Sequence, residues 1–134
     1  MTVTRRGFLA GSAAAAGVGA LAACAPSGSS PEPTSSPGAP LVALADVPVG
    51  SAVITTAASG DEVVVAQPQA GTVVAFSAAC THQGCIVRVD GGRLACPCHG
   101  SVFDAATGAV EQGPAARPLV PYAVEVQGDA VVEG

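Results

Sequence analysis

The chain has no lysine, and its positive charge is confined to five arginines. Only Arg88, Arg93 and Arg117 follow residue 24, whereas all ten acidic residues do, so this part of the chain carries a formal charge of −7. A surface so poor in cations argues against nucleic acid as a partner, because binding to phosphates requires clustered lysine and arginine. Anionic lipid headgroups would also repel it. Any association with a membrane therefore requires a covalent or hydrophobic anchor.

Sustained helical periodicity is also missing, and leucine is scarce. Short apolar runs rich in valine are instead broken by turn signals, and Asp-Gly-Gly at residues 90–92 and Gly-Asp at residues 128–129 predict hairpins. We therefore expect an all-β protein. The predicted strands lie within residues 41–44, 51–57, 62–67, 72–79, 86–89, 93–96, 122–127 and 130–134.

A catalytic constellation is absent as well. The sequence shows no general base, nucleophile or open metal position, so the chain by itself is expected to catalyse nothing. The part expected to fold, from Leu41 to the end, is small enough to be marginally stable alone. A cofactor, a disulfide or both are therefore expected to support it.

The first 24 residues have the pattern of an export signal. Arg5 and Arg6 precede an uncharged stretch rich in Ala and Gly that ends at Ala23, which is typical of a twin-arginine leader. The residues before Cys24 resemble the bacterial lipobox, which predicts cleavage and attachment of lipid to Cys24 as the membrane anchor. Two alternatives remain open, an uncleaved transmembrane helix and cleavage without lipid, although the apolar run is short and weak for a span.

Residues 25–40 consist almost entirely of Pro, Ser, Gly and Ala. This composition predicts a linker, which would reach about 50 Å if it were fully polyproline-like. We therefore expect a leader over residues 1–24, a linker over residues 25–40 and one folded domain over residues 41–134.

Both histidines and four of the five cysteines lie between Cys80 and His99. They occur as C-x-H in CTHQGC and as C-x-x-H in CPCHG, and the predicted hairpin between these boxes brings them to one end of a small sheet. Two loops that each offer a thiolate and an imidazole can hold a metal cluster, with a reduction potential above that of a four-thiolate cluster. The residues alone leave open a structural zinc site and a module held only by disulfides.

The boxes CTHQGC and CPCHGS closely resemble the two cluster-binding boxes of Rieske [2Fe–2S] proteins. The resemblance covers residues 41–134 and implies a small antiparallel β-sandwich of the Rieske type, with two cluster-binding loops at one end and one [2Fe–2S] cluster. Carried over by position, it implies Cys80 and Cys96 as the ligands of one iron and His82 and His99 as the ligands of the other.

The same resemblance implies roles for residues around the ligands. Cys85 and Cys98 would form the disulfide typical of the exported branch of the family, which requires an oxidising compartment. Ser101 matches a serine whose hydroxyl donates a hydrogen bond to a bridging sulfide. Phe103 stands where quinol-oxidising members usually have tyrosine, so we expect a lower potential because one donor to a ligand thiolate is missing. Residues 113–115 resemble the family's Pro loop, which covers the cluster.

For function, the resemblance implies a carrier of single electrons between redox protein partners, or a subunit of an oxidoreductase. Together with the leader, it predicts an exported protein anchored through lipidated Cys24 on the outer face of the cytoplasmic membrane. An alternative is the Rieske subunit of a cytochrome bc-type quinol-oxidising complex. Those subunits have a permanent transmembrane helix and commonly leucine where this chain has Gln83. The ferredoxin of an aromatic-ring dioxygenase is disfavoured by the expected disulfide and leader.

Overall fold

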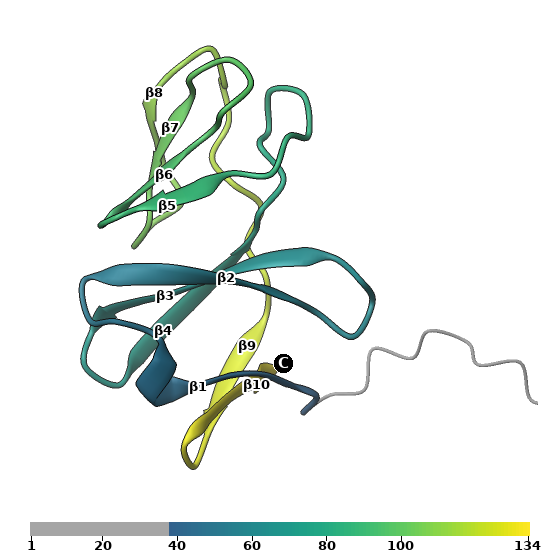
Figure 1. Cartoon of the computed structure of the whole chain (residues 1–134), viewed down its shortest axis with the longest axis vertical. Coiled ribbons are helices and arrows are strands. Elements are labelled where there is room, and N and C mark those ends of the chain that lie inside the picture. Colours follow the sequence, from purple (N-terminus) through teal and green to yellow (C-terminus); the bar gives the residue numbers. More distant parts are fainter. Residues whose placement is uncertain (1–37) are drawn as a thin grey trace, which may run out of the picture. The chain divides into compact units, whose positions relative to one another are not determined.

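The computed structural model describes residues 38–134 (Figure 1), so the predicted leader, Cys24 and most of the predicted linker lie outside the described residues. Apart from one 3-10 turn, the regular elements of the described part are all short strands, which confirms the all-β prediction. Within it, no helix is long and apolar enough to cross a membrane. The elements are β1 (Pro40–Ala43), the single 3-10 turn η1 (Leu44–Asp46), β2 (Ser51–Thr56), β3 (Glu62–Gln69), β4 (Thr72–Ser77), β5 (Arg88–Asp90), β6 (Arg93–Ala95), β7 (Val102–Asp104), β8 (Val110–Gln112), β9 (Val124–Gln127) and β10 (Ala130–Glu133).

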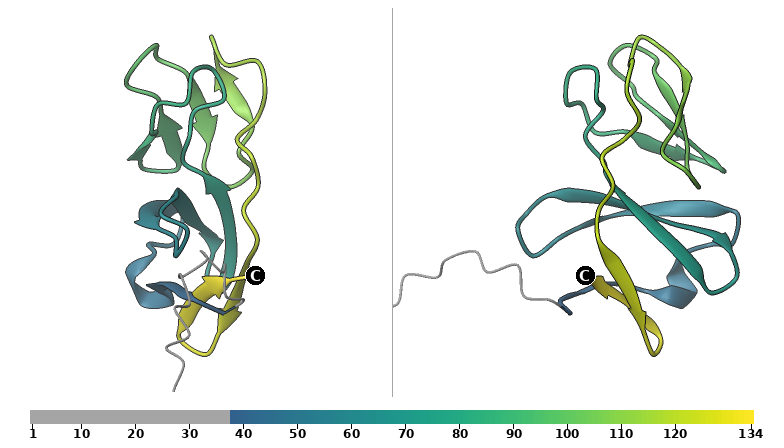
Figure 2. Two further views of the ribbon diagram at one scale, coloured as in Figure 1. Left: turned by 90° about the vertical axis from the view of Figure 1, so that its right-hand side faces the viewer. Right: turned by 180° about the vertical axis from the view of Figure 1, so that it is seen from behind.

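The strands form three antiparallel sheets, with the orders β1-β10-β9, β2-β3-β4 and β5-β6-β7-β8. The two three-stranded sheets form a base, and the four-stranded sheet with its loops stands at the other end of the described part (Figure 1). Figure 2 shows from two further sides how the segment after β8 runs past the loops and back to β9 in the base. The predicted antiparallel β-sandwich is therefore present, and the four-stranded sheet at one end carries the cysteine boxes.

Strand β3 is central in its sheet and is buried on both faces. Its pleat sends Val64 and Ala66 into the core that extends toward the cysteine boxes, and Val63 and Val65 into the core beneath β1, β9 and β10. A strand buried on both faces is expected to be continuously apolar rather than alternating. This explains the unbroken run of valine and alanine in β3.

The predicted hairpin between the two boxes is confirmed as β5 and β6, which pair from Arg88↔Ala95 to Asp90↔Arg93. Gly91 in its turn has φ +62°, a conformation that glycine adopts without strain. Strands β7 and β8 were not predicted. They extend this hairpin into the four-stranded sheet, whose inner side chains Leu94 and Phe103 are fully buried.

Candidate metal centre

The first box forms a tight loop between β4 and β5. The N–H of Cys80 donates to the carbonyl oxygen of Cys85 (2.8 Å), and the N–H of Gly84 donates back to the carbonyl oxygen of Cys80 (2.7 Å). Gly84 has φ +78°, which lets the backbone turn back sharply without strain. These bonds hold the side chains of the box at the end of the strands.

The second box, between β6 and β7, repeats this hydrogen-bond pattern. The N–H of Cys96 donates to the carbonyl oxygen of Ser101 (2.7 Å), and the N–H of Gly100 donates to the carbonyl oxygen of Cys96 (3.0 Å). Gly100 has φ +79°, almost the value of its counterpart in the first loop. Two loops of the same backbone design therefore stand at one end of the molecule, each opened by a cysteine.

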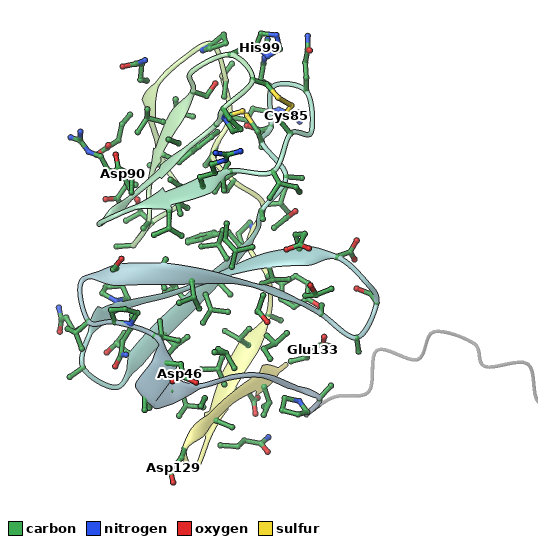
Figure 3. All side chains as sticks on the ribbon, in the orientation of Figure 1. Asp46, Cys85, Asp90, His99, Asp129 and Glu133 are labelled. Atoms are coloured by element: carbon green, nitrogen blue, oxygen red, sulfur yellow. A yellow bond between two sulfur atoms is a disulfide. The ribbon has the colours of Figure 1, made fainter. Side chains whose placement is uncertain are left out.

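A disulfide joins the two loops. Cys85 and Cys98 are bonded, with an S–S distance of 2.01 Å and 6.4 Å between their Cα atoms. Figure 3 shows this bridge beside His99 at the end of the molecule farthest from the base. The pairing implied by the family resemblance is therefore confirmed.

The two other cysteines of the boxes, Cys80 and Cys96, are free thiols. They are 2% and 3% exposed and lie in the core that also contains Phe103. The Sγ atom of Cys96 lies within 4.8 Å of the sulfurs of Cys85 and Cys98. Because those two sulfurs are bonded to each other, they are not available as thiolate ligands, and the free thiols remain as candidates.

The environment of Cys96 favours its thiolate. Burial raises the pKa of the thiol, but hydrogen bonds from the Cys98 N–H, the Cys80 side chain and the His99 N–H together lower the pKa below its usual value. Backbone N–H groups that point at a sulfur stabilise negative charge on it. The thiolate is the form of cysteine that binds metals.

The two histidines lie together. The ring centroids of His82 and His99 are 4.8 Å apart, with an angle of 83° between the ring planes. His82 is half-buried, whereas His99 is exposed at the tip (Figure 3). The Nδ1 atom of His82 is buried and has no hydrogen-bond partner. An unpaired buried ring nitrogen is costly unless it has a role such as binding a metal.

The segment between β8 and β9 covers the loops from a third side. The buried hydroxyl of Ser101 accepts a hydrogen bond from the N–H of Ala115 (2.9 Å), which leaves its own proton free to be donated elsewhere. The hydroxyl of Thr81 donates to the carbonyl oxygen of Arg117 (2.6 Å). Sequence reasoning missed Thr81, although its position directly before a candidate ligand in CTHQGC was a usable signal.

These residues fit a [2Fe–2S] cluster. Two buried free thiols, one with a stabilised thiolate, and two neighbouring imidazoles, one with an unpaired buried nitrogen, make a mixed sulfur and nitrogen donor set. In Rieske centres, histidines replace two of the four cysteine ligands of such a cluster. All four predicted ligand residues thus lie on the two disulfide-linked loops.

Comparisons with known proteins agree with this chemistry. The family model of the Rieske [2Fe-2S] domain matches residues 39–124. The cytochrome b6-f complex iron-sulfur subunit of Gloeobacter violaceus is 46% identical over 59 residues, which cover 42% of this chain and 31% of the relative. The corresponding subunit of Chlorobaculum tepidum is 36% identical over 89 residues, which cover 65% of this chain and 48% of the relative. The chain thus spans about a third to a half of the length of these curated relatives.

Solved structures share the fold. The plasma membrane Rieske protein PetC3 from Synechocystis PCC 6803 is 34% identical with a TM-score of 0.55, and the match covers 63% of this chain and 86% of that one. The ferredoxin of Sphingomonas yanoikuyae B1 is 28% identical with a TM-score of 0.59, covering 72% and 96%. The zinc and disulfide-only alternatives are wrong, because a family match of this extent accounts for the cysteines and histidines together. The chain belongs to the Rieske [2Fe-2S] domain family of electron-transfer proteins, and its cofactor is one [2Fe–2S] cluster.

Proposed function

We propose that this chain carries single electrons between redox protein partners while it is tethered to the outer face of the cytoplasmic membrane. The observation that carries the proposal is the arrangement of two buried free thiols and two neighbouring imidazoles on disulfide-linked loops. The cluster supplies one-electron chemistry when it is bound. The residues of the chain hold it, shield it and provide the exit route.

In this proposal, Cys80 and Cys96 hold one iron, and His82 and His99 hold the other. The burial of both thiols and the lowered pKa of Cys96 support the sulfur ligands. The unpaired Nδ1 atom of His82 supports the nitrogen ligands. Ser101 would donate its hydroxyl proton to the cluster, since its oxygen already accepts the hydrogen bond from the N–H of Ala115.

The exposed ring of His99 is the route by which electrons leave and enter. It stands at the tip, whereas the thiols lie in the interior. An electron partner therefore approaches the histidine side of the loops.

The membrane tether is the part of the proposal that rests on the sequence. The twin-arginine pattern and the lipobox-like residues before Cys24 support export and lipid attachment, and the disulfide supports an oxidising compartment. The described chain begins in the base, where β1 starts at Pro40, far from the cysteine loops (Figure 1). A tether attached there leaves the loops free to meet partners.

A second candidate is a subunit of a cytochrome bc-type quinol-oxidising complex. Its support comes from the relatives, which are named as cytochrome b6-f iron-sulfur subunits. The glutamine at position 83 weighs against it, since quinol-oxidising members commonly have leucine there.

Two measurements test the proposal on membranes that contain the full chain. An electron paramagnetic resonance signal that appears on reduction and disappears in Cys96→Ser and His99→Ala supports the assigned ligands, and a wild-type protein without such a signal contradicts them. Purification of the intact protein in mild detergent identifies its partners. Recovery with a soluble or peripheral redox protein supports the carrier, whereas stoichiometric recovery with a cytochrome b favours the second candidate.

A further inference from the structure

An apolar groove lies beside the first cysteine loop. It has a volume of about 300 Å³ and is lined by Thr81 and residues 117–121. Leu119 in this lining is buried, whereas the side chain of Val120 is 58% exposed. Thr81 directly precedes His82, whose ring contacts His99. A protein segment seated in the groove would therefore lie next to the histidine pair.

One of the residues that line the groove carries a positive charge. Arg117 is exposed, and the Thr81 hydroxyl fixes its backbone through the hydrogen bond to its carbonyl oxygen. Among residues 38–134, the recorded ion pair joins Arg93 and Glu111 (2.9 Å), so the guanidinium of Arg117 has no acidic partner there. An exposed cation without a partner is available to a carboxylate on another protein.

Charge is divided unevenly over the described chain. Residues 78–119, with the loops and the four-stranded sheet, hold three arginines and three acidic residues. The remaining described residues, in the base, hold no arginine or lysine and six acidic residues, among them Asp46, Asp129 and Glu133 (Figure 3). The loop end is therefore neutral, and the base is strongly negative.

We propose that this groove docks a redox protein whose contact face is acidic and carries an apolar side chain. A carboxylate of the partner pairs with Arg117, and the apolar side chain contacts Val120 and fills the groove. The base repels an acidic partner, so such a partner meets the histidine end first. A basic partner would instead be drawn to the base, far from the loops. This inference rests on the proposed electron-transfer function.

Docking in this groove would serve the transfer of a single electron. One electron passes from the reduced holoprotein to one oxidised haem of the partner, and no bond forms or breaks. Suitable probes are two soluble c-type cytochromes of similar potential, one with net negative and one with net positive charge. Stopped-flow mixing of each ferric cytochrome with the reduced full-length holoprotein gives second-order rate constants. Near physiological ionic strength, interactions between charges more than about 8 Å apart are screened. The rate constants measured there therefore report mainly the ion pair between Arg117 and a carboxylate of the partner.

Substitutions at two positions test the surface, each with a matched control. Arg117→Gln is compared with Arg93→Gln, which removes the same charge from the same half of the molecule. Val120→Ser is compared with Val49→Ser, because Val49 is 61% exposed but lies in the base. All four positions are exposed, so the variants are expected to fold and to keep the cluster signal.

The proposal expects the acidic cytochrome to react about two- to fivefold more slowly with Arg117→Gln, the effect of losing one exposed ion pair. Arg117→Glu slows electron transfer to the acidic cytochrome further, and Val120→Ser also slows this reaction. The controls leave this rate within error of wild type, and none of the Arg117 variants slows the basic cytochrome.

Equal effects of Arg117 and Arg93, or equal slowing of both cytochromes, would overturn the docking surface while leaving the electron-transfer function intact. A wild-type holoprotein that reduces neither cytochrome would instead contradict the function itself. Sedimentation of the holoprotein measures its oligomeric state and so tests whether a second copy of the chain occupies the groove instead. A dimer that Val120→Ser dissociates would also overturn the proposal.

Discussion

At the scale of single residues, the side chains around the free thiols decide how the centre is tuned. Phe103 is fully buried in the core that also holds Cys80 and Cys96, and it offers no hydroxyl. Ser101 supplies a buried hydroxyl that can donate a hydrogen bond, and the N–H of Ala115 fixes the orientation of this hydroxyl. Donors that stabilise the negative charge of the reduced state raise the potential. Two substitutions separate these contributions.

Phe103→Tyr is expected to raise the one-electron reduction potential. A new hydroxyl donor to a ligand thiolate contributes about 1 kcal/mol in favour of the reduced state, which corresponds to on the order of 40 mV. A redox titration of the holoprotein followed by its electron paramagnetic resonance signal measures the change. Phe76→Tyr adds the same hydroxyl elsewhere in the same core and should leave the potential unchanged. A variant that keeps its cluster at the wild-type potential would contradict the expected role.

Ser101→Ala is expected to lower both the potential and the stability. The cluster loses a hydroxyl donor, and the buried N–H of Ala115 loses its acceptor, which costs about 1–3 kcal/mol. The same redox titration and chemical denaturation measure the two effects. Ser59→Ala in the base serves as the control, because the Ser59 hydroxyl is exposed and bonds to the neighbouring Asp61, far from the loops. If Ser101→Ala loses stability but keeps the wild-type potential, the hydroxyl has a structural role alone.

At the scale of elements, the disulfide and the segment after β8 connect the two cysteine loops, each of which forms within its own stretch of chain. Each loop closes on its own backbone hydrogen bonds around a glycine with positive φ. The Cys85–Cys98 bond then joins the loops directly, and the bonds from Thr81 and Ser101 to the segment after β8 join them through a third piece of chain. The loops therefore depend on contacts between residues distant in sequence.

The double variant Cys85→Ala and Cys98→Ala tests this dependence. It is expected to lower the free energy of unfolding by about 3 kcal/mol in the chain-entropy description of a bridge closing a loop of this size. It should also release the cluster faster, since the loops can then separate. Denaturation followed by far-UV circular dichroism gives the first quantity, and loss of visible absorption with time gives the second. Cluster loss as slow as in wild type would mean that the segment after β8 holds the loops sufficiently.

Two of the hairpins could be predicted from the sequence, whereas the pairing of β7 and β8 could not. The hairpin of β5 and β6 and that of β9 and β10 follow from alternating apolar residues around Asp-Gly-Gly and Gly-Asp turns, and both are confirmed. Strands β7 and β8 have three residues each, as β5 and β6 do, but no Asp-Gly or Gly-Asp dipeptide stands between them to indicate a hairpin. Their pairing comes from the neighbouring β6, which offers a free edge in the folded sheet.

At the scale of the whole molecule, the charge distribution and the proposed tether bear on where the domain works. The base carries the first described strand, and the loop end carries all three arginines that follow the leader. A domain anchored through its base can turn its loop end toward partners within the reach of the predicted linker.

Cys24→Ser is expected to release the protein from the membrane. Without the thiol, lipid cannot be attached, and the acidic domain has no affinity for anionic headgroups. Fractionation of cells into membrane and soluble parts, with immunodetection, measures the change. A variant in which Arg5 and Arg6 are replaced by lysine provides the comparison, since loss of export differs from loss of the anchor. If Cys24→Ser stays in the membrane fraction, an uncleaved anchor is indicated instead.

The sequence by itself determined the all-β class, because short valine-rich runs broken by turns are typical of strands. It gave the family, the cofactor and the disulfide pairing through the resemblance of its two boxes to those of Rieske proteins, and the family match and the bridge confirm this resemblance. The choice of Cys80, His82, Cys96 and His99 as ligands stays a prediction, which the geometry supports. Only the tertiary structure decided that Thr81 and Ser101 hold the segment after β8, that His99 is exposed while His82 is half-buried, and that Arg117 lines an apolar groove. These features depend on which residues distant in sequence come into contact when the sheets pack, and local patterns do not determine those contacts.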